Sequence, residues 1–282
     1  MIVEPPGDPR ARKGLPFLST IVGDIDERGR LSGWIRLGSF GSYAAERACE
    51  ISGTAMTKPV AAGDVTDYDG VCDEAAPAGA ASDVEENVET TNLTVADKWG
   101  NVVEYTLTIE QTGGSGLLLE DRGFLLNNEL TDFTTVYDPA DPNRIQPGKR
   151  PRSSMSPTIV LRDGKPFVAL GSPGGSTIIT TVVQTILNRV DLEMTTPEAI
   201  AAPRASQRNT TSVTAEPEFI DAYGSQLEEY GHKLTPAGDA FTSAAEIGAA
   251  TAIEFMSDGS MVAAAEPARR GGGSALLLEP SR

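Results

Sequence analysis

The sequence predicts an α+β fold in which paired β-strands carry two or three packed α-helices. Three segments, 90–109, 157–172 and 250–266, alternate apolar and polar residues on both sides of a polar turn, which is typical of β-hairpins. Two further segments, 178–190 and 218–230, place apolar residues at the spacing of an α-helix. Paired strands with helices packed on them indicate a layered α+β domain.

The first predicted hairpin begins at the dipeptide Thr90–Thr91. Leu93 and Val95 alternate with polar neighbours, turn-forming residues occupy 97–101, and the alternation returns in 103–109. A slip of one residue would give every side chain a different partner, so the register decides which groups meet. The favoured register pairs Ala96 with Val102, Thr94 with Glu104, Asn92 with Thr106, and Thr90 with Thr108.

The second and third hairpins are marked by Asp-Gly turns, at Asp163–Gly164 and Asp258–Gly259. Thr196 and Pro197 suit the N-cap and the first position of a helix. Gly231 suits the C-cap of the later helix. The helix predicted at 178–190 carries one apolar stripe, made of Ile179, Val182, Val183, Ile186 and Val190.

The residues before Thr90 carry weaker patterns. Residues 41–52 are compatible with a helix, whereas 59–89 are rich in Ala, Gly, Pro and acidic residues and predict a solvated loop. The spacing of Cys49 and Cys72 matches no metal site, and it is compatible with a disulfide without requiring one.

Composition argues against several classes of function. The formal net charge of −17 argues against a nucleic-acid partner, because phosphate binding needs clustered Lys and Arg. The one dense basic stretch, 148–152, is too short for such a surface. No window approaches about 18 consecutive apolar residues, which predicts no membrane span. The N-terminus lacks the apolar core of a signal peptide.

Histidine and metal chemistry are also disfavoured. The single histidine, His232, follows a predicted helix end, and we interpret it as structural. The sequence shows no cluster of three or four His, Cys or carboxylate residues of the kind that binds zinc. An enzyme with this sequence would therefore work without histidine, and we expect no metal and no other cofactor.

The Thr90–Thr91 pair points to a different chemistry. A threonine hydroxyl is a poor nucleophile unless a base lies close to it. The α-amino group of the threonine itself, with a pKa of about 8, would serve as that base if the chain were cut just before it. The acidic segment before Thr90 is the kind of exposed stretch in which a cut is tolerated. The alternative is that Thr-Thr only begins a strand, which threonine favours.

From Thr90 to about Asn209 the sequence resembles the small subunit of γ-glutamyltranspeptidases, which are N-terminal-nucleophile hydrolases with an αββα sandwich. Several motifs that follow one another in the family's order indicate the family more specifically than any single motif does. They are TTNLTVADKWGNVVEYTLT, GFLLNNELTDF, KRPRSSMSPTIV, GSPGGSTIITT, APR at 202–204, and EPARRGGGSA near the C-terminus.

The resemblance implies a nucleophile and the way in which it is freed. The proenzyme would cut itself between Glu89 and Thr90, and Thr90 would then attack the substrate. Thr108 would hydrogen-bond the nucleophile, which agrees with the favoured register. Asn92 stands where many family members have His.

The resemblance also assigns residues to the substrate. Glu129 and Asp132 would hold the α-amino group of a γ-glutamyl donor, and two neighbouring carboxylates do suit an ammonium group. Ser153 and Ser154 would hydrogen-bond the donor's α-carboxylate, with Glu110 close to that group. The plainer alternatives are a solvated acidic edge for the first pair and ordinary loop residues for the serines.

Gly174 and Gly175 would supply the backbone amides of an oxyanion hole. A glycine loop that leads into a helix presents N–H groups and a helix dipole to a developing anion, which supports this role on physical grounds. The alternative is that SPGGST is only a tight turn. The Pro-rich stretch 138–147 lies where some family members carry a longer lid, and its shortness resembles the lid-less members, with an open acceptor site.

By this interpretation residues 1–89 are the end of a large subunit with an acidic linker, and 90–282 are the catalytic small subunit. The chain would be a truncated proenzyme, a C-terminal fragment or one half of a split gene, and its expected partner is the missing large-subunit segment. The expected reaction transfers the γ-glutamyl group of a donor such as glutathione to water or to an amino acid or peptide. The alternatives are a related acylase of the cephalosporin type and an inactive remnant that binds a ligand or a partner chain.

Overall fold

The computed structural model of the chain describes residues 24–25, 31–32, 46–47, 49–51, 53–60, 69–72, 89–238 and 247–279. Most of the acidic loop predicted at 59–89 lies outside the described residues, and so does most of the first predicted domain. The architecture below therefore concerns mainly the part of the chain from Glu89 onward.

A four-stranded antiparallel sheet forms the centre of the structure, with the strand order β13–β12–β8–β7. β7 (Thr158–Arg162) and β8 (Lys165–Gly171) are the second predicted hairpin, and β12 (Thr251–Phe255) and β13 (Met261–Ala265) are the third. The turn residues Asp163–Gly164 both have positive φ, which this two-residue turn requires. Both predicted hairpins are confirmed, and pairing of β8 with β12 joins them into one sheet.

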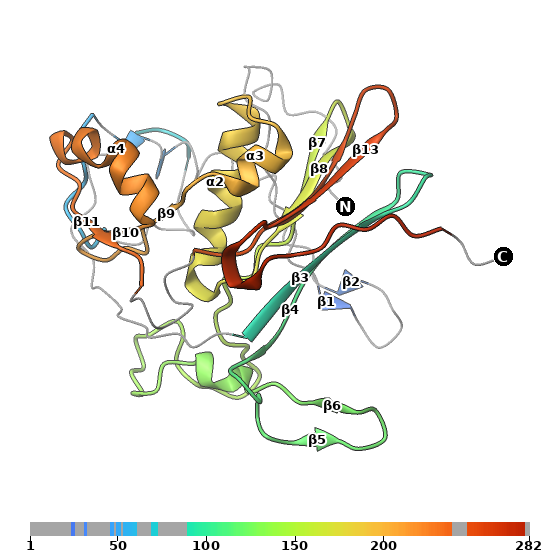
Figure 1. Cartoon of the computed structure of the whole chain (residues 1–282). Helices are drawn as coiled ribbons and strands as arrows, with labels where there is room; N and C mark the ends of the chain where they lie inside the picture. The colour runs from blue at the N-terminus through green and yellow to red at the C-terminus, as the bar shows by residue number, and fades with distance from the viewer. Residues whose placement is uncertain are drawn as a thin grey trace.

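Two helices, α2 (Ile178–Val190) and α3 (Thr196–Ala201), cover one face of this sheet (Figure 1). Both were predicted. The main hydrophobic core lies between the helices and the sheet, where burial of apolar side chains favours the folded state. It includes Val160, Val168, Leu170, Ile178, Val182, Ile186, Ile200 and Ala252.

The apolar stripe predicted for α2 is wrong in part. Ile179 and Val183 are 50% and 44% exposed, whereas Thr181 and Thr185 are buried. The buried threonines fit the core because each hydroxyl donates a hydrogen bond to the backbone carbonyl four residues earlier, at 2.9 and 2.8 Å. Since their polar groups are satisfied within the helix, α2 can turn a mixed face to the sheet and leave two apolar residues outside.

The N-cap predicted for α3 is wrong by one residue. The N-cap is Thr195, whose hydroxyl accepts from the backbone N–H of Glu198, while the Glu198 carboxylate accepts from the N–H of Thr195. This reciprocal arrangement is a capping box. Thr196 is instead buried, and its hydroxyl donates to Glu254 of β12, which ties α3 to the sheet.

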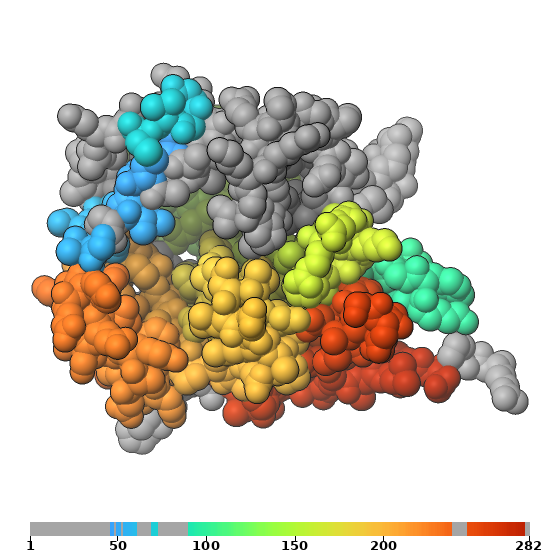
Figure 2. Space-filling model, turned by 90° about the horizontal axis from the view of Figure 1, so that it is seen from above, coloured from blue at the N-terminus to red at the C-terminus, as the bar shows by residue number. Residues whose placement is uncertain are grey.

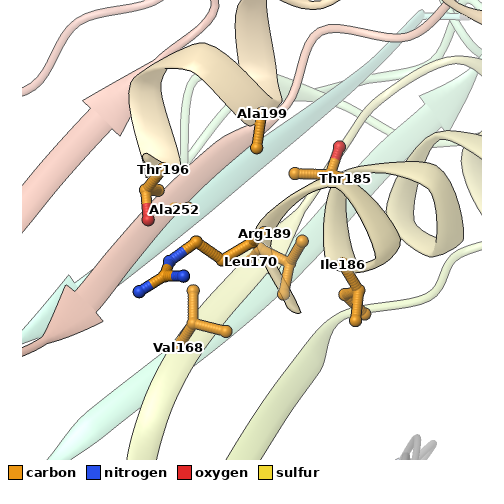
Figure 3. A pocket seen from close by; sticks show the side chains of 8 residues that line it. All are labelled: Val168, Leu170, Thr185, Ile186, Arg189, Thr196, Ala199 and Ala252. Atoms are coloured by element: carbon orange, nitrogen blue, oxygen red, sulfur yellow. The ribbon is translucent and has the colours of Figure 1, made fainter. Parts of the chain in front are cut away.

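A small cavity remains between α2, α3 and the sheet (Figure 3). Arg189 of α2 extends its guanidinium group into this layer and forms an ion pair with Glu254 at 2.5 Å. A buried charge is tolerated only when it is paired in this way. The rest of the lining is mostly apolar and consists of Val168, Leu170, Thr185, Ile186, Thr196, Ala199 and Ala252.

The first predicted hairpin, β3 (Glu89–Ala96) and β4 (Val102–Glu110), packs on the other face of the sheet against β8 and β12. All four pairs of the favoured register are confirmed. The hairpin turns its polar face toward the sheet and its apolar face outward. More than a third of each outward apolar side chain is exposed: Leu93, Val95, Val103, Tyr105 and Leu107.

A smaller unit lies beside α2. It contains α4 (Pro217–Glu229) and a three-stranded sheet in the order β11–β10–β9. β9 contacts α2. Figure 2 shows α4 in orange on one side of the yellow layer of α2 and α3, with the tips of the central strands on its other side. The C-cap of α4 is Tyr230, one residue before the predicted Gly231. Gly231 follows with a φ of 91°, and the N–H of His232 donates to the carbonyl of Leu227, so His232 lies at the helix end as predicted. The strands are β9 (Ala205–Ser206), β10 (Val213–Ala215) and β11 (Leu234–Pro236).

Three buried charged residues, Arg204, Glu216 and Glu266, join the smaller unit to the central sheet together with the half-buried Arg269. Arg204 pairs with Glu266 at 3.0 Å, and Arg269 bridges Glu266 at 2.9 Å and Glu216 at 2.6 Å. Glu216 also accepts from the backbone N–H of Arg204. Each charge has an opposite partner, so the network fixes the geometry of this junction without leaving a buried charge unpaired.

The described part of the N-terminal region contains a disulfide between Cys49 and Cys72. It closes a loop that contacts the smaller unit, because the Asn209 side chain accepts from the N–H of Val60 and donates to its carbonyl. Glu46 and Arg47 are helical, in agreement with the helix expected at 41–52.

Two short antiparallel strand pairs complete the description, and they are β1 (Asp24–Ile25) with β2 (Leu31–Ser32) and β5 (Leu118–Leu119) with β6 (Phe124–Leu125). Within the described ranges, no helix has the length and apolar character needed to cross a membrane.

The two faces of α2 lead to a first prediction. Ile186→Ala should lower the free energy of unfolding by about 2–5 kcal/mol, because it leaves a cavity in the core, where Ile186 is 2% exposed. Ile179→Ala, on the exposed face of the same helix, should change it by no more than about 0.5 kcal/mol. Urea unfolding of the full chain, followed by circular dichroism, measures both. Equal losses would mean that α2 presents a different face to the sheet.

Candidate active site

The site is built around two threonine hydroxyls at the open end of the β3–β4 hairpin. Thr90 donates a hydrogen bond from Oγ1 to Oγ1 of Thr108 at 3.0 Å. The Thr108 oxygen also accepts from the backbone N–H of Glu110 at 2.8 Å. These contacts hold the Thr90 hydroxyl in one direction, which a nucleophile requires.

The ladder becomes irregular at the bond where the sequence predicts a cut. The pairing register shifts between Glu89 and Thr90, as in a β-bulge. Glu110, which lies opposite Glu89, has a positive φ of 73°, which is uncommon for a residue other than glycine. Bulges are common next to active sites because they redirect a side chain or end the strand pairing.

The carboxyl group of Glu110 is held by neighbours that the sequence analysis did not identify. Its Oε2 atom accepts from the Asn128 side-chain amide at 2.7 Å and from the Thr131 hydroxyl at 3.1 Å. Asn128 and Thr131 belong to the NNELTDF segment, so the motif was visible, but their contact with Glu110 across the chain was not.

Glu129 and Asp132 lie on one turn of 3₁₀ helix, Glu129–Asp132, beside Glu110. The pKa of Glu129 is raised to about 7 by partial burial, by the charges of Asp132 and Glu110, and by its hydrogen bond with Asp132. Three close carboxyl groups favour a bound cation, because a positive charge would relieve their mutual repulsion. The arrangement therefore suits an ammonium group.

Ser153 and Ser154 line the same pocket. The Ser154 hydroxyl donates to the backbone carbonyl of Gly175 at 2.7 Å, and the Ser153 hydroxyl accepts from the N–H of Met155 at 3.3 Å. The serine pair is thus linked to the glycine loop. These hydroxyl groups can hydrogen-bond an anionic group that enters the pocket.

Gly174 and Gly175 begin the short 3₁₀ helix Gly175–Thr177, which continues into α2. Their φ values are 141° and 54°. A Cβ atom on Gly174 would lie 2.7 Å from Oγ1 of Thr177 and 3.1 Å from Cα of Gly248, so only glycine fits at this position. The backbone is thereby brought to the N-terminal end of a helix, where N–H groups and the helix dipole favour an anion.

These residues form one pocket. Every predicted site residue lines it except Gly174, which adjoins it through Gly175. Two apolar lining residues were not predicted, namely Met155, which directly follows the serine pair, and Ile178, which directly follows GGST. The pocket is lined by Thr90, Thr108, Glu110, Glu129, Asp132, Ser153, Ser154, Met155, Gly175 and Ile178.

The second cavity and the histidine of the described residues lie outside this pocket. The cavity under α2 is part of the core, and its arginine is paired with Glu254 (Figure 3). His232 ends α4 and is not among the residues that line the pocket. No group of three or more His, Cys, Asp or Glu residues in the described ranges has the geometry of a metal site.

Comparison with known proteins gives consistent matches. The family model described as gamma-glutamyltranspeptidase matches residues 23–276. The chain is 41% identical over 192 residues to the glutathione hydrolase proenzyme of Bacillus subtilis (strain 168). This alignment covers 68% of this chain and 31% of that protein. It spans less than a third of the length of each of the five bacterial glutathione hydrolases compared.

Two solved structures are similar in fold. A chain of the γ-glutamyltranspeptidase from Pseudomonas nitroreducens, in complex with L-DON, has a TM-score of 0.56 at 32% identity and covers 67% of this chain and 100% of that chain. The cephalosporin acylase from Bacillus halodurans has a TM-score of 0.57 at 26% identity and covers 67% of this chain and 34% of that chain.

The three carboxyl groups of the pocket lead to a second prediction. Asp132→Asn should lower the pKa of Glu129 from about 7 toward its ordinary value of 4.5, because it removes one of the negative charges that raise it. Carbon-13 NMR titration of the labelled glutamate carboxyl groups measures this pKa. Asp121→Asn, a change at an exposed residue, is the matched control and should leave the Glu129 titration where it is. An unchanged titration in Asp132→Asn would mean that Asp132 and Glu129 do not interact.

Proposed function

Because this chain belongs to the gamma-glutamyltranspeptidase family, we propose that it catalyses γ-glutamyl transfer and hydrolysis with Thr90 as the nucleophile. The fold is that of N-terminal-nucleophile hydrolases, and the described residues contain a helix layer, the central sheet and the stacked hairpin. The observation that carries the proposal is the single pocket that brings Thr90 together with a glycine loop, a carboxyl cluster and a serine pair.

Cleavage between Glu89 and Thr90 is proposed to come first. It frees the α-amino group of Thr90, whose ordinary pKa of about 8 lets it accept a proton near neutral pH. The register shift at this bond supports the assignment, because such irregularities are common next to active sites. In the uncut chain the Thr108 hydroxyl holds the Thr90 oxygen in place, and we propose that it keeps this contact after the cut.

In the proposed reaction Oγ1 of Thr90 attacks the γ-glutamyl carbonyl, and its proton passes to the α-amino group. The carbonyl oxygen becomes an oxyanion, which the backbone N–H groups of Gly174 and Gly175 stabilise. The amide C–N bond then breaks, and the leaving amine takes the proton. An ester between Thr90 and the glutamyl group remains, and water or an acceptor amine resolves it.

The α-ammonium and α-carboxylate groups of the γ-glutamyl donor are proposed to bind to different groups of the pocket. The carboxyl groups of Glu110, Glu129 and Asp132 receive the α-ammonium group, and the hydroxyl groups of Ser153 and Ser154 receive the α-carboxylate. Glu110 fits the ammonium side better than the carboxylate side, because it adds to the negative charge around Glu129. Relatives named glutathione hydrolase make glutathione the first donor to test.

A large-subunit segment is proposed to cover the apolar face of the hairpin. Leu93, Val95, Val103 and Tyr105 are between 47% and 59% exposed. Contiguous exposed apolar surface of this kind usually marks an interface.

The proposed boundary assigns residues up to Glu89 to the large subunit and Thr90 onward to the small subunit. Co-expression with a large subunit of the family should therefore favour the active assembly.

A second candidate is an acylase that acts on a different amide, which the likeness to the cephalosporin acylase favours. The two candidates differ in the substrate's ammonium group. A glutaryl amide has the same chain as a γ-glutamyl amide but lacks that group, so the carboxyl cluster should disfavour it. A higher kcat/KM for the glutaryl amide would support the acylase.

The nucleophile assignment predicts the products of the wild-type chain and of one variant. Co-expressed with a large subunit, wild type should yield a fragment whose N-terminal sequence begins Thr-Thr-Asn. Thr90→Ala should stay uncut and inactive, because it lacks the hydroxyl. Thr91→Ala, at the exposed neighbouring residue, is the matched control and should still be cut. Normal cleavage of Thr90→Ala would defeat the assignment, and an uncut wild type would favour a non-catalytic binding role.

The glutamyl-head assignment predicts a selective loss of affinity. Asp132→Ala should raise KM for a γ-glutamyl anilide roughly ten- to a hundredfold, since a hydrogen bond to a charged group is worth about 1.5–3 kcal/mol. The same variant should leave KM for the glutaryl anilide nearly unchanged, because that substrate has no ammonium group. If KM rises equally for both substrates, Asp132 shapes the pocket instead of binding the ammonium.

A further inference from the structure

A polar, largely half-buried layer lies between the β3–β4 hairpin and the central sheet. Its centre is Asn92, two residues after Thr90. The Asn92 amide nitrogen donates to Oε1 of Glu104 at 2.6 Å and to Oγ1 of Thr251 at 2.8 Å. Its amide oxygen accepts from the Thr106 hydroxyl at 2.7 Å. Asn92 therefore links both strands of the hairpin to β12 of the sheet.

The Glu104 side chain is the unusual member of this layer. Its Oε2 atom is buried and has no hydrogen-bond partner in the part of the chain that the structure describes. Burial raises the pKa of Glu104 to about 7, against the smaller lowering effects of the hydrogen bonds from Thr94 and Asn92. An isolated carboxylate in such a place is unfavourable, because no charge or full set of donors replaces its water.

Among the described residues, the groups around Glu104 are uncharged. β3 presents Asn92 and Thr94, and β8 presents Gly171. Thr251 of β12 bonds to Asn92 and Thr94 behind them. No charged residue is among the causes of the shifted pKa. The surroundings of Glu104 in the described residues therefore favour a neutral carboxyl group.

The layer also lies against Gly171, the last residue of β8, which leads to the glycine loop at Gly174 and Gly175. A Cβ atom on Gly171 would lie 2.3 Å from Oδ1 of Asn92 and 2.4 Å from Oε1 of Glu104, so the two side chains occupy the space that any other residue would need. Gly171 ends β8 and is followed by Ser172, Pro173 and then Gly174. Asn92 lies on the strand that carries Thr90 and is bonded to Glu104, and both side chains lie against the strand that leads to Gly174.

We propose that Asn92 and Glu104 are positioning residues that fix the Thr90 strand against the Gly171–Gly175 segment, and that Glu104 does so as a neutral, protonated carboxylic acid. The inference rests on the proposed roles of Thr90 and Gly174. Deprotonation of Glu104 would place a charge in the layer, loosen the contact and move the nucleophile away from the oxyanion-binding amides.

The sign of the pH effect follows from the raised pKa. A carboxyl group whose pKa is higher in the folded than in the unfolded state contributes its full stabilisation at low pH and loses it as pH rises through about 7. Glu129 titrates in the same range, so the effect of Glu104 has to be isolated by a variant.

The test compares wild type, Glu104→Gln, Glu104→Ala and the control Glu228→Gln, each as the full chain co-expressed with a large subunit. Glu228 lies on the exposed face of α4. Infrared difference spectra between wild type and Glu104→Gln at pH 6 should show the carbonyl band of a protonated carboxyl group. The melting temperature of wild type should fall between pH 5 and 8 by more than that of Glu104→Gln, because only wild type has the titrating group. Glu228→Gln should behave as wild type.

Hydrogen exchange and kinetics test the positioning itself. Glu104→Ala should speed amide exchange in both 90–94 and 171–175 and lower kcat for a γ-glutamyl anilide by roughly tenfold or more at nearly constant KM, since small displacements of reacting groups are costly. Glu104→Gln should keep the wild-type kcat at pH 6 and lose the decline that wild type shows above about pH 7.

The outcomes separate the inference from the proposed function. Absence of the protonated-carboxyl band, or identical pH profiles for wild type and Glu104→Gln, would overturn the neutral form. Faster exchange in 90–94 without any change in 171–175 would overturn the positioning role. A wild type without γ-glutamyl activity would refute the proposed function alone, because the infrared and exchange results would still decide the inference.

Discussion

The inward-facing polar side of the β3–β4 hairpin is the constraint on which the site depends. Buried polar groups are stable only when they are hydrogen-bonded, so Asn92, Thr94, Thr106 and Thr251 have few arrangements open to them. A slip of one residue would bury apolar side chains against this layer and leave its polar groups unpaired. The hydrogen bonds therefore set where Thr90 lies relative to the glycine loop.

Local patterns predicted much of this fold. Turn chemistry located the three hairpins, including the register that brings Thr90 and Thr108 together. It could not show which side of the first hairpin packs on the sheet, because alternation defines two faces and does not orient them. In α2 the same limitation appears: Thr181 and Thr185 look polar in sequence, but they satisfy their hydroxyl groups within the helix and enter the core.

The candidate site was predictable to the extent that its residues lie in distinctive short motifs. The acidic, serine and glycine motifs are far apart in sequence, and the structure places them around one pocket. The residues that were missed act through contacts across the chain. Asn128 and Thr131 hold Glu110, and Met155 and Ile178 add apolar walls, and none of these contacts has a pattern in the local sequence.

The position of the disulfide has a consequence for how the halves of a cleaved chain would stay together. Cys49 and Cys72 both precede Glu89, so their bond closes a loop on one side of the proposed cut and does not bridge it. The described contacts from this loop to the later residues are hydrogen bonds, such as those between Val60 and Asn209. Cohesion across the break would then be non-covalent, and it would be lost on denaturation even under oxidising conditions.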